Sequence, residues 1–304
     1  MAAEILLLGK DGQAGWELQR SLLPLGPLTA LGRRDLDLTD RAALEQGLQA
    51  LAPRIIVNAA AYTAVDKAEQ DVELAMAVNA TVPAILADYC HRSGALLVHY
   101  STDYVFDGAK EAPYREDDAT GPLSVYGASK LAGEQAIIAS GAAALLLRVS
   151  WVFGEQGNNF VKTILRLAAE RDGLRVVADQ FGAPTPAAFI ADATALLLAA
   201  LRQRPLPAGM ATYHLSTRNP VSWHGFAQAI VAMAAEIPGF ALKLGPEQIA
   251  AITTADYPLP ARRPANSRLD TGRIEQDFGL HIPDWQPYLQ RLLQQLAIRQ
   301  GGRT

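Results

Sequence analysis

A short apolar run near the start of the chain leads directly into three closely spaced glycines. Residues Ile5–Leu8 are all aliphatic, and Gly9, Gly12 and Gly15 follow as G-x-x-G-x-x-G before an amphipathic stretch. Glycine permits a tight turn and a close approach of the backbone to a ligand, and a helix N-terminus offers unpaired N–H groups to an anion. The pattern predicts a strand, turn and helix that bind a dinucleotide diphosphate, and we favour this over a plain strand-to-helix turn.

Apolar runs alternate with amphipathic stretches through the first half of the chain. The runs expected to form buried strands are Ile5–Leu8, Leu28–Leu31, Ile55–Val57, Leu96–Tyr100 and Leu145–Val149. The stretches with helical patterning are Gln13–Leu23, Asp40–Leu51, Asp71–Ser93 and Ser124–Ser140. Strands that alternate with helices form a parallel sheet covered on both faces. We therefore expect an α/β fold with a doubly wound parallel sheet of the Rossmann type.

The pattern changes after Trp151, where proline and glycine become frequent and predict loops and short elements. We expect residues 1–150 to form an NAD(P)-binding domain and residues 151–304 to form mainly a smaller C-terminal α/β substrate-binding domain. Later segments such as residues 211–235 are expected to return to the sheet, and Tyr213–Leu215 is the candidate strand.

Composition excludes several classes of protein. Hydrophobic residues make up 50% of the chain and charged residues 19%, which favours a sizeable core over disorder. The net charge of -4 provides no basic footprint for nucleic acid. A single cysteine, Cys90, excludes an internal disulfide framework and is typical of a reducing compartment. We find neither a signal-peptide pattern nor an apolar stretch of ~20 residues, so we expect a cytoplasmic protein without membrane contact.

A tyrosine and a lysine stand four residues apart in the Ser124–Ser140 stretch. At this spacing Tyr126 and Lys130 share one face of a helix. A positive charge ~4 Å from a phenol favours its ionised form. Lys130 is therefore expected to lower the pKa of Tyr126 and make it a better general acid for a ketone under reduction. The same spacing also occurs on ordinary surface helices.

Two further features support the chemical interpretation. The Leu96–Tyr100 run leads into Ser101-Thr102-Asp103, and a hydroxyl at the carboxyl end of a parallel strand lies where such sheets bind ligands. Thr102 can bond a substrate oxygen and the tyrosine hydroxyl. The third strand ends in Asn58 and small alanines, which allow a cofactor to lie close to the backbone.

The residues after the second strand indicate the type of nicotinamide cofactor. An NAD site usually has an acidic residue ~20 positions after the glycines, whereas this chain has Gly32, Arg33 and Arg34. Because arginine can bind a 2′-phosphate through a bidentate fork, we expect NADPH to be preferred, with NADH possible. Two solvated loop arginines are the alternative. Asp37 is expected near the adenine.

Longer motifs give the chain a family resemblance. Those that carry it are Gly9–Trp16, Asn58–Asp66, Ser101–Phe106, Tyr126-Gly127-x-x-Lys130, Arg148–Val152, Gly157–Phe160, Asp179–Thr185 and Arg263–Ser267. With these motifs, nearly the whole chain resembles the extended short-chain dehydrogenases, and within them the dTDP-4-dehydrorhamnose reductases. The resemblance implies hydride transfer from NADPH or NADH to C4 of dTDP-4-dehydro-L-rhamnose, the last step of dTDP-L-rhamnose synthesis.

The resemblance also implies a role for each matching residue. The implied catalytic residues are Thr102, Tyr126 and Lys130. The expected cofactor-binding residues are Gly9, Asp11, Gly12, Gln13, Ala14, Gly15, Arg33, Arg34, Asp37, Leu38, Ala59, Ala60, Ala61, Tyr62, Tyr126 and Lys130. The expected substrate-binding residues are Thr102, Asp103, Tyr104, Trp151, Asn159, Arg263 and Asn266. Lys130 would also hold the nicotinamide ribose.

Assembly, metal content and reaction class leave alternatives open. Some members of the family form Mg²⁺-bridged dimers through acidic side chains; Glu17 occupies one such position, but the carboxylate expected near Ala187–Phe189 is missing. We therefore predict no metal, and a monomer or homodimer that binds a dTDP-sugar. The alternatives are another sugar-nucleotide reductase or epimerase, or a non-catalytic regulatory subunit of the same fold.

Overall fold

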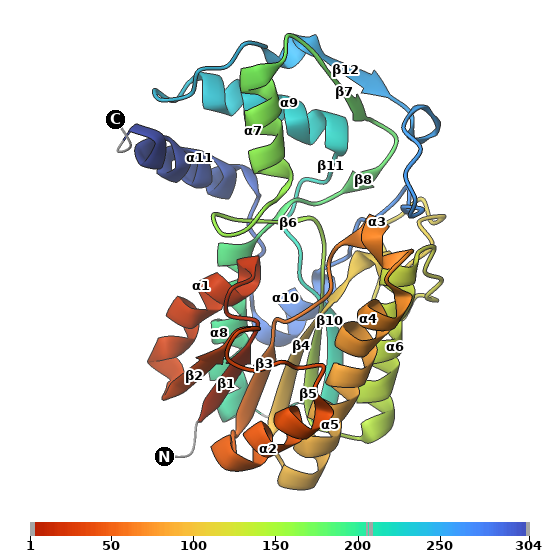
Figure 1. The fold of residues 1–304 in the computed structure, drawn as a ribbon, viewed down its shortest axis with the longest axis vertical. Helices are drawn as coiled ribbons and strands as arrows, with labels where there is room; N and C mark the ends of the chain where they lie inside the picture. Colours follow the sequence, from red (N-terminus) through yellow and green to blue (C-terminus); the bar gives the residue numbers. More distant parts are fainter. Residues whose placement is uncertain (1–3, 205, 207–208, 302–304) are drawn as a thin grey trace.

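The larger part of the molecule is built around a six-stranded parallel sheet (Figure 1). The structure is a computed structural model and describes residues 4–204, 206 and 209–301. The strands are β1 (Ile5–Leu8), β2 (Leu28–Leu31), β3 (Ile55–Asn58), β4 (Leu96–Thr102), β5 (Ala144–Val149) and β10 (Met210–His214). Their order is β10-β5-β4-β3-β1-β2, and every neighbouring pair is parallel. The predicted doubly wound sheet is confirmed.

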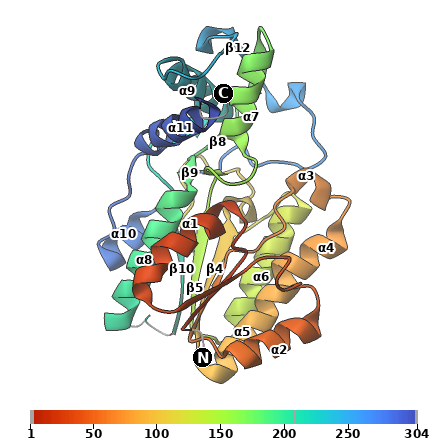
Figure 2. The same cartoon turned by 60° about the vertical axis from the view of Figure 1, so that its left-hand side comes forward.

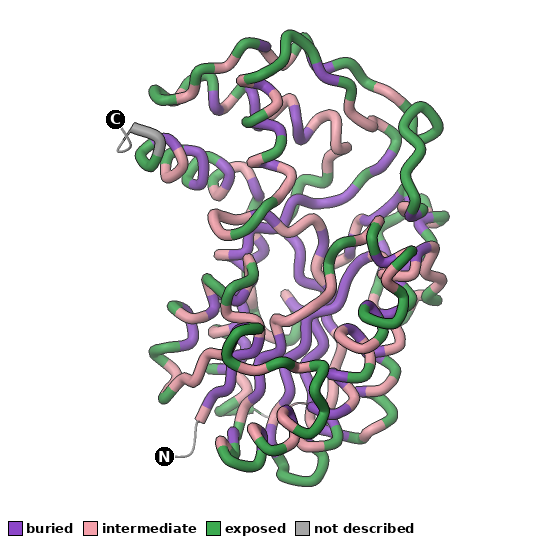
Figure 3. The backbone as a smooth tube through the Cα atoms, viewed as in Figure 1, coloured by how far each residue is buried: buried purple, intermediate pink, exposed green. Residues whose placement is uncertain are grey.

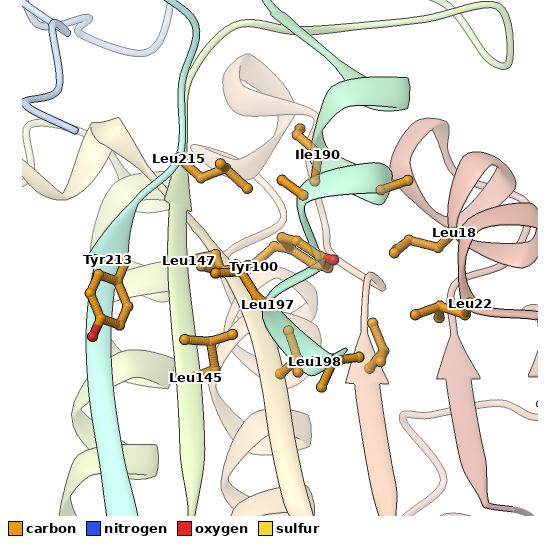
Figure 4. Close-up of a cluster of buried hydrophobic side chains, with 14 of the residues drawn as sticks. Leu18, Leu22, Tyr100, Leu145, Leu147, Ile190, Leu197, Leu198, Tyr213 and Leu215 are labelled. Atoms are coloured by element: carbon orange, nitrogen blue, oxygen red, sulfur yellow. The ribbon is translucent and has the colours of Figure 1, made fainter. Parts of the chain in front are cut away.

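Helices cover both faces of this sheet, and each face has its own hydrophobic core (Figure 2). One face carries α1 (Gln13–Leu22), α8 (Ala187–Gln203) and α10 (Gly272–Phe278), while the other carries α2 (Arg41–Leu51), α5 (Val82–Ser93) and α6 (Val125–Ser140). On the first face Leu18 of α1, Leu197 of α8 and Leu147 of β5 belong to one core, in which Leu197 lies between the other two (Figure 4). Leu146 belongs to the core of the opposite face, because side chains alternate along a strand.

The bounds of most elements in the first half agree with the expected ones, with two informative differences. Strand β4 runs two residues further than predicted, so Thr102 forms its last position. The single helix expected over Asp71–Ser93 is divided into α4 (Val72–Met76), a π turn (Ala77–Thr81) and α5. A Cβ on Gly133 of α6 would lie 2.1 Å from the carbonyl oxygen of Asn79 in this turn, so the two segments pack unusually closely.

The later part of the chain builds a second hydrophobic core above the large sheet. Its elements are β6 (Val152–Phe153), α7 (Phe160–Glu170), β7 (Leu174–Val177), β8 (Phe181–Gly182), β9 (Thr185–Pro186), β11 (Val221–Ser222), α9 (Trp223–Ala235), β12 (Ile249–Ile252) and α11 (Gln286–Gly301). The strands pair as β6–β9, β7–β12 and β8–β11. Figure 3 shows that buried residues occur in the interior of both halves of the molecule.

The expectation of loops and short elements after Trp151 was only partly right. The paired strands are short, but α7, α9 and α11 are regular helices of 11, 13 and 16 residues. Helix α7 forms because Val161, Ile164 and Leu165 share one buried face. The segments rich in proline and glycine form the connections and contribute to the short strands β8 and β9.

Besides α10, two later elements pack with the large sheet. Strand β10 pairs with β5, in agreement with a returning strand near Tyr213, and α8 packs against α1. Helix α9 belongs instead to the second core. The domain boundary near residue 150 stays a prediction. No helix in the described ranges is both long and apolar enough to span a membrane.

A buried ion pair joins α6 to β5. Arg148 donates to Glu134 through Nη2 at 2.7 Å and through Nε at 3.0 Å, and both side chains are almost fully buried. Arg148 also donates to the Glu116 carbonyl at 3.2 Å. Such a pair is strongly destabilising to break, because the remaining partner is a buried charge without compensation.

We expect Arg148→Met to lower the free energy of unfolding by about 3–5 kcal/mol, because Glu134 stays buried without its partner. Chemical denaturation measures the change. The double variant Glu134→Leu/Arg148→Met should recover most of the loss, since it removes both charges. The matched control is Arg166→Ala, which breaks an exposed pair with Glu170 and should cost at most about 1 kcal/mol. A loss for Arg148→Met no larger than that of the control would contradict the prediction.

Candidate active site

A cavity of about 420 Å³ opens where β1, β2 and β3 end at the carboxyl edge of the sheet. Gly9 has φ +84°, and a Cβ there would lie 2.6 Å from the backbone nitrogen of Ala60. A Cβ on Gly15 would lie 1.9 Å from the Gly9 carbonyl oxygen. Both positions require glycine, so the glycine pattern shapes the turn. The predicted cofactor residues that line the cavity are Gly9, Asp11, Gly12, Arg33, Asp37, Leu38, Ala59, Ala60, Ala61 and Tyr62.

The other predicted cofactor residues lie outside the lining of this cavity as described by the structure. Gln13 accepts a hydrogen bond from Asn159 at 2.9 Å and so joins α1 to the start of α7. Ala14 packs against the core of the first face, and Arg34 is exposed. Tyr126 and Lys130 approach the site from α6. The cofactor assignment of these residues stays a prediction.

The end of β4 places two polar side chains at the centre of the carboxyl edge. Thr102 is buried, accepts a hydrogen bond from the Tyr104 backbone N–H at 3.2 Å, and donates to Asp103 Oδ1 at 2.9 Å. Asp103 begins a single 3-10 turn, Asp103–Val105. The Thr102 hydroxyl is therefore held in place by one backbone and one side-chain hydrogen bond with the two residues that follow it.

Helix α6 brings Tyr126 to this point. Ser124 caps the helix by accepting from the Gly127 N–H at 3.2 Å. A Cβ on Gly127 would lie 2.2 Å from the Tyr104 carbonyl oxygen, so glycine allows the first turn of α6 to pack against the Asp103–Val105 turn. The rings of Tyr104 and Tyr126 meet edge to face, with centroids 5.8 Å apart. Burial raises the pKa of Tyr126 to about 12, against the opposing effect of a hydrogen bond with Thr102.

Lys130, one turn further along the same helix, points inward and is buried, with only 1% of its surface exposed. Its Nζ donates to the Tyr100 carbonyl at 2.6 Å and lies 3.3 Å from His99 Nε2. Burial lowers the pKa of Lys130 to about 8. The expectation that Lys130 would lower the pKa of Tyr126 is not met here: burial dominates, and the ammonium is directed to Tyr100 and His99.

Sequence reasoning did not assign a site role to His99 or Asn58. The Asn58 amide lies 3.1 Å from His99 Nδ1, so β3, β4 and α6 are linked through Asn58, His99 and Lys130. The sequence feature that could have indicated a role for His99 is its place in an otherwise apolar strand, three residues before Thr102. Burial holds the pKa of His99 well below its usual value, so the ring is neutral.

A second cavity of about 610 Å³ lies in the C-terminal half, lined by residues that include Phe160, Trp223 and Arg263. Trp223 stacks on Trp151 with ring centroids 3.4 Å apart. Trp151 has φ +43°, and a Cβ on Gly182 would lie 2.5 Å from its indole ring. The predicted substrate contact Trp151 is thus clamped between two segments. Sequence reasoning missed Trp223, which is far from Trp151 along the chain.

Three other predicted substrate residues have protein partners in the structure. Arg263 forms a bidentate pair with Asp66, at 2.7 Å and 3.0 Å, and this pair ties the C-terminal loop to the first half of the chain. Asn159 caps α7 by accepting from the Lys162 N–H at 3.1 Å. Asn266 donates to the Ala112 carbonyl at 2.9 Å. Of the three, only Arg263 lines the second cavity, and all three substrate roles stay predictions.

Asp103 is an unusual buried carboxyl. Only 2% of its surface is exposed, and within the described residues its Oδ2 has no hydrogen-bond partner. Burial raises the pKa of Asp103 to about 6, although nearby hydroxyls, Ser267 and Thr102 foremost, oppose the shift. Asp103 is therefore a group whose charge changes near neutral pH.

Acidic and histidine side chains do not gather into a candidate metal site. No group of three or more potential ligands occurs within the residues that the structure describes. Glu17 lies 3.7 Å from Arg20, which pairs with Asp192 at 2.8 Å. The absence of a metal stays a prediction.

The raised pKa of Asp103 implies that folding favours its protonated form. Stability is then greatest below the unfolded-state pKa of about 3.9 and falls as the pH rises toward the folded-state value. We expect Asp103→Asn to remove this loss and to stabilise the protein at neutral pH by up to ~3 kcal/mol, with no gain at about pH 4. Denaturation at the two pH values measures the difference, and an equal effect at both would refute it.

Comparison with known proteins identifies the family to which the chain is similar. The chain matches the family model described as RmlD substrate binding domain over residues 3–298. A protein named dTDP-4-dehydrorhamnose reductase from Burkholderia thailandensis is 49% identical over 93% of this chain and 95% of its own length. The protein of the same name from Escherichia coli K12 is 47% identical over 96% and 97%.

A solved structure extends the comparison to the fold. The crystal structure of dTDP-4-dehydrorhamnose reductase from Bacillus anthracis in complex with NADP has a TM-score of 0.84 and 34% identity, over 96% of this chain and 99% of that one. The family resemblance expected from the motifs is confirmed. The chain belongs to the RmlD substrate binding domain family, together with relatives named dTDP-4-dehydrorhamnose reductase.

Proposed function

We propose that this chain reduces the C4 ketone of dTDP-4-dehydro-L-rhamnose to give dTDP-L-rhamnose, the last step in forming that sugar nucleotide. NADPH is the expected cofactor, and NADH is possible. The observation that carries the proposal is that α6 brings Tyr126 within reach of Thr102 at the end of β4, while Lys130 on the same helix donates to the Tyr100 carbonyl of that strand. The names of the relatives and the NADP complex of one of them support the same reaction.

The cofactor cavity fits a dinucleotide. Its floor is the glycine turn, where Gly12 leads into the N-terminus of α1 and offers backbone N–H groups to a diphosphate. Ala59 and Ala60 form the facing wall, which small side chains leave open. Arg33 lines the cavity after β2, where a 2′-phosphate is recognised in folds of this kind. When bound, the dihydronicotinamide supplies the hydride.

The residues of the chain provide the proton and hold the ketone. Tyr126 donates its hydroxyl proton to the oxygen of the ketone as that oxygen becomes a hydroxyl. Thr102 is proposed to hold the tyrosine hydroxyl in position. Lys130 is proposed to bind the nicotinamide ribose with the Nζ proton that is not directed to Tyr100 or His99. Because burial favours the neutral phenol, Tyr126 retains its proton until the reaction needs it.

The second cavity is suited to the nucleotide part of the substrate. Arg175, Arg262 and Arg263 line it, and guanidinium groups bind diphosphates through charge-assisted hydrogen bonds. Trp223 and Phe160 provide aromatic surface in the same cavity. The proposed contacts of the sugar are Asp103, Tyr104 and Trp151: the Tyr104 ring meets that of Tyr126, and Trp151 stacks on Trp223 of this cavity. A cytoplasmic location and a monomeric or homodimeric state complete the proposal.

We expect Tyr126→Phe to lower kcat at least ~100-fold with dTDP-4-dehydro-L-rhamnose, because the phenyl ring cannot donate a proton. NADPH oxidation, followed by absorbance, and identification of the sugar product provide the measurement. Tyr89→Phe, on α5, is the matched control and should retain full activity. Turnover without net NADPH consumption would indicate an epimerase. Well-folded wild type that is inactive with both cofactors would favour a different ketosugar or a regulatory role.

The two arginines after β2 are expected to contribute unequally to NADPH binding. Arg33→Ala is expected to raise the KM for NADPH about tenfold and to leave the KM for NADH nearly unchanged, because it removes one charge-assisted contact to the 2′-phosphate. Arg34→Ala should have a smaller effect, since only Arg33 of the two lines the cavity. Arg92→Ala, on α5, is the control. A wild type that strongly prefers NADH would refute the prediction.

A further inference from the structure

The hydrogen bonds of Thr102 determine which way its hydroxyl can act. A threonine hydroxyl has one proton and two lone pairs. In the structure the proton is directed to Asp103 Oδ1 at 2.9 Å, and one lone pair accepts from the Tyr104 N–H at 3.2 Å. One lone pair remains for the neighbouring Tyr126 hydroxyl, so in this arrangement Tyr126 can only be the donor in a hydrogen bond with Thr102. Thr102 has no proton left to give to Tyr126.

The proposed reaction requires the opposite direction of this hydrogen bond, with Thr102 as the donor and Tyr126 as the acceptor. If Tyr126 gives its proton to the substrate, the phenolate that forms is stabilised by a donor beside it. Thr102 can be that donor only when Asp103 does not take its proton. A protonated Asp103 would donate to Thr102, and the Thr102 proton would then be free for Tyr126.

We propose that Asp103 is a positioning residue that sets the direction of the hydrogen bond between Thr102 and Tyr126, with the protonated carboxyl giving the active direction. This inference rests on the proposed role of Tyr126 as general acid. It assigns Asp103 a function beyond contact with the sugar.

The surroundings of Asp103 favour this role. The side chain is buried, and its Oδ2 has no partner among the described residues, which disfavours the ionised form. The groups that influence it are Thr102 on β4, Ser150 after β5 and Ser267 in the C-terminal loop, all uncharged. Tyr126 is the titratable group that faces it from α6. Burial therefore raises the pKa of Asp103 to about 6, so both forms are populated near neutrality.

The charge of Asp103 acts in the same direction as the hydrogen bonds. An ionised Asp103 raises the pKa of Tyr126 by electrostatic repulsion of the phenolate. The same charge also raises the pKa of Tyr104, the titratable group next to it in the chain. The ionised carboxylate also accepts the hydrogen bond from Thr102, so the Thr102 proton is not available to Tyr126. The effects on Tyr126 both make it a weaker acid, so reduction should slow as Asp103 loses its proton.

The test compares kcat across about pH 5 to pH 8 for wild type, Asp103→Asn and the control Asp107→Asn, with saturating substrate and NADPH. The amide introduced by Asp103→Asn resembles the protonated carboxyl and cannot ionise. We expect wild-type kcat to fall several-fold as the pH rises through the Asp103 pKa, and kcat of Asp103→Asn to vary less than about twofold. Asp107→Asn, on an exposed loop, should follow wild type. A deuterium isotope effect with NADPD shows whether hydride transfer limits the rate.

Other outcomes overturn the inference. An inflection retained in Asp103→Asn, or absent from wild type, would exclude control of Tyr126 by Asp103. A change confined to KM would leave Asp103 only as a substrate contact. In a Thr102→Val background, Asp103→Asn should change the pH profile less than it does in wild type, since only the direct electrostatic effect of Asp103 on Tyr126 remains. Full activity of Tyr126→Phe would refute the proposed acid itself, whereas an inactive Tyr126→Phe with an unchanged Asp103→Asn profile would refute only this inference.

Discussion

The close packing of α6 against β4, β5 and the π turn is the constraint on which the site depends. Two glycines permit it: Gly127 meets the Tyr104 carbonyl, and Gly133 meets the Asn79 carbonyl. The buried pair between Glu134 and Arg148 holds the same helix to β5. A helix displaced by about one ångström at these points would carry Tyr126 away from Thr102, and such displacements are costly in catalysis.

Burial sets the electrostatics of the site more than any single pair of charges does. It favours the neutral forms of Tyr126, Lys130 and Asp103 together, because each charged form loses hydration inside the fold. A tyrosine and a lysine on one helix face suggest a simple pair in which the lysine activates the phenol. The structure shows a wider network in which Lys130 is held by Tyr100 and His99, while Tyr126 is tuned by Thr102 and Asp103.

The two halves of the chain meet at the site through polar contacts between distant residues. Gln13 at the start of α1 accepts from Asn159 at the start of α7, and Asp66 binds Arg263. Both contacts connect a segment beside the cofactor cavity with one that belongs to the C-terminal half. These contacts hold the C-terminal half of the chain against the segments beside the cofactor cavity.

Local sequence pattern was sufficient to predict the large sheet, the glycine turn and the order of the candidate catalytic residues along the chain. Apolar runs such as Ile5–Leu8 and the Tyr126–Lys130 spacing depend on near neighbours in the sequence, and these are the features that periodicity records. The family motifs added the reaction. The helices α7, α9 and α11 were not anticipated, because frequent proline and glycine around them obscured their periodicity.

Tertiary structure alone decided the contacts between distant residues. The stacking of Trp151 on Trp223, the Arg263–Asp66 pair, and the link from Asn58 through His99 to Lys130 join residues with no recognisable spacing. The same holds for the pKa values, since desolvation depends on everything that surrounds a side chain. The order of the residues specifies which chemical groups this protein has and how they are spaced along the chain. Their partners and charges follow only from the packed chain, because burial and hydrogen-bond direction are properties of the three-dimensional environment.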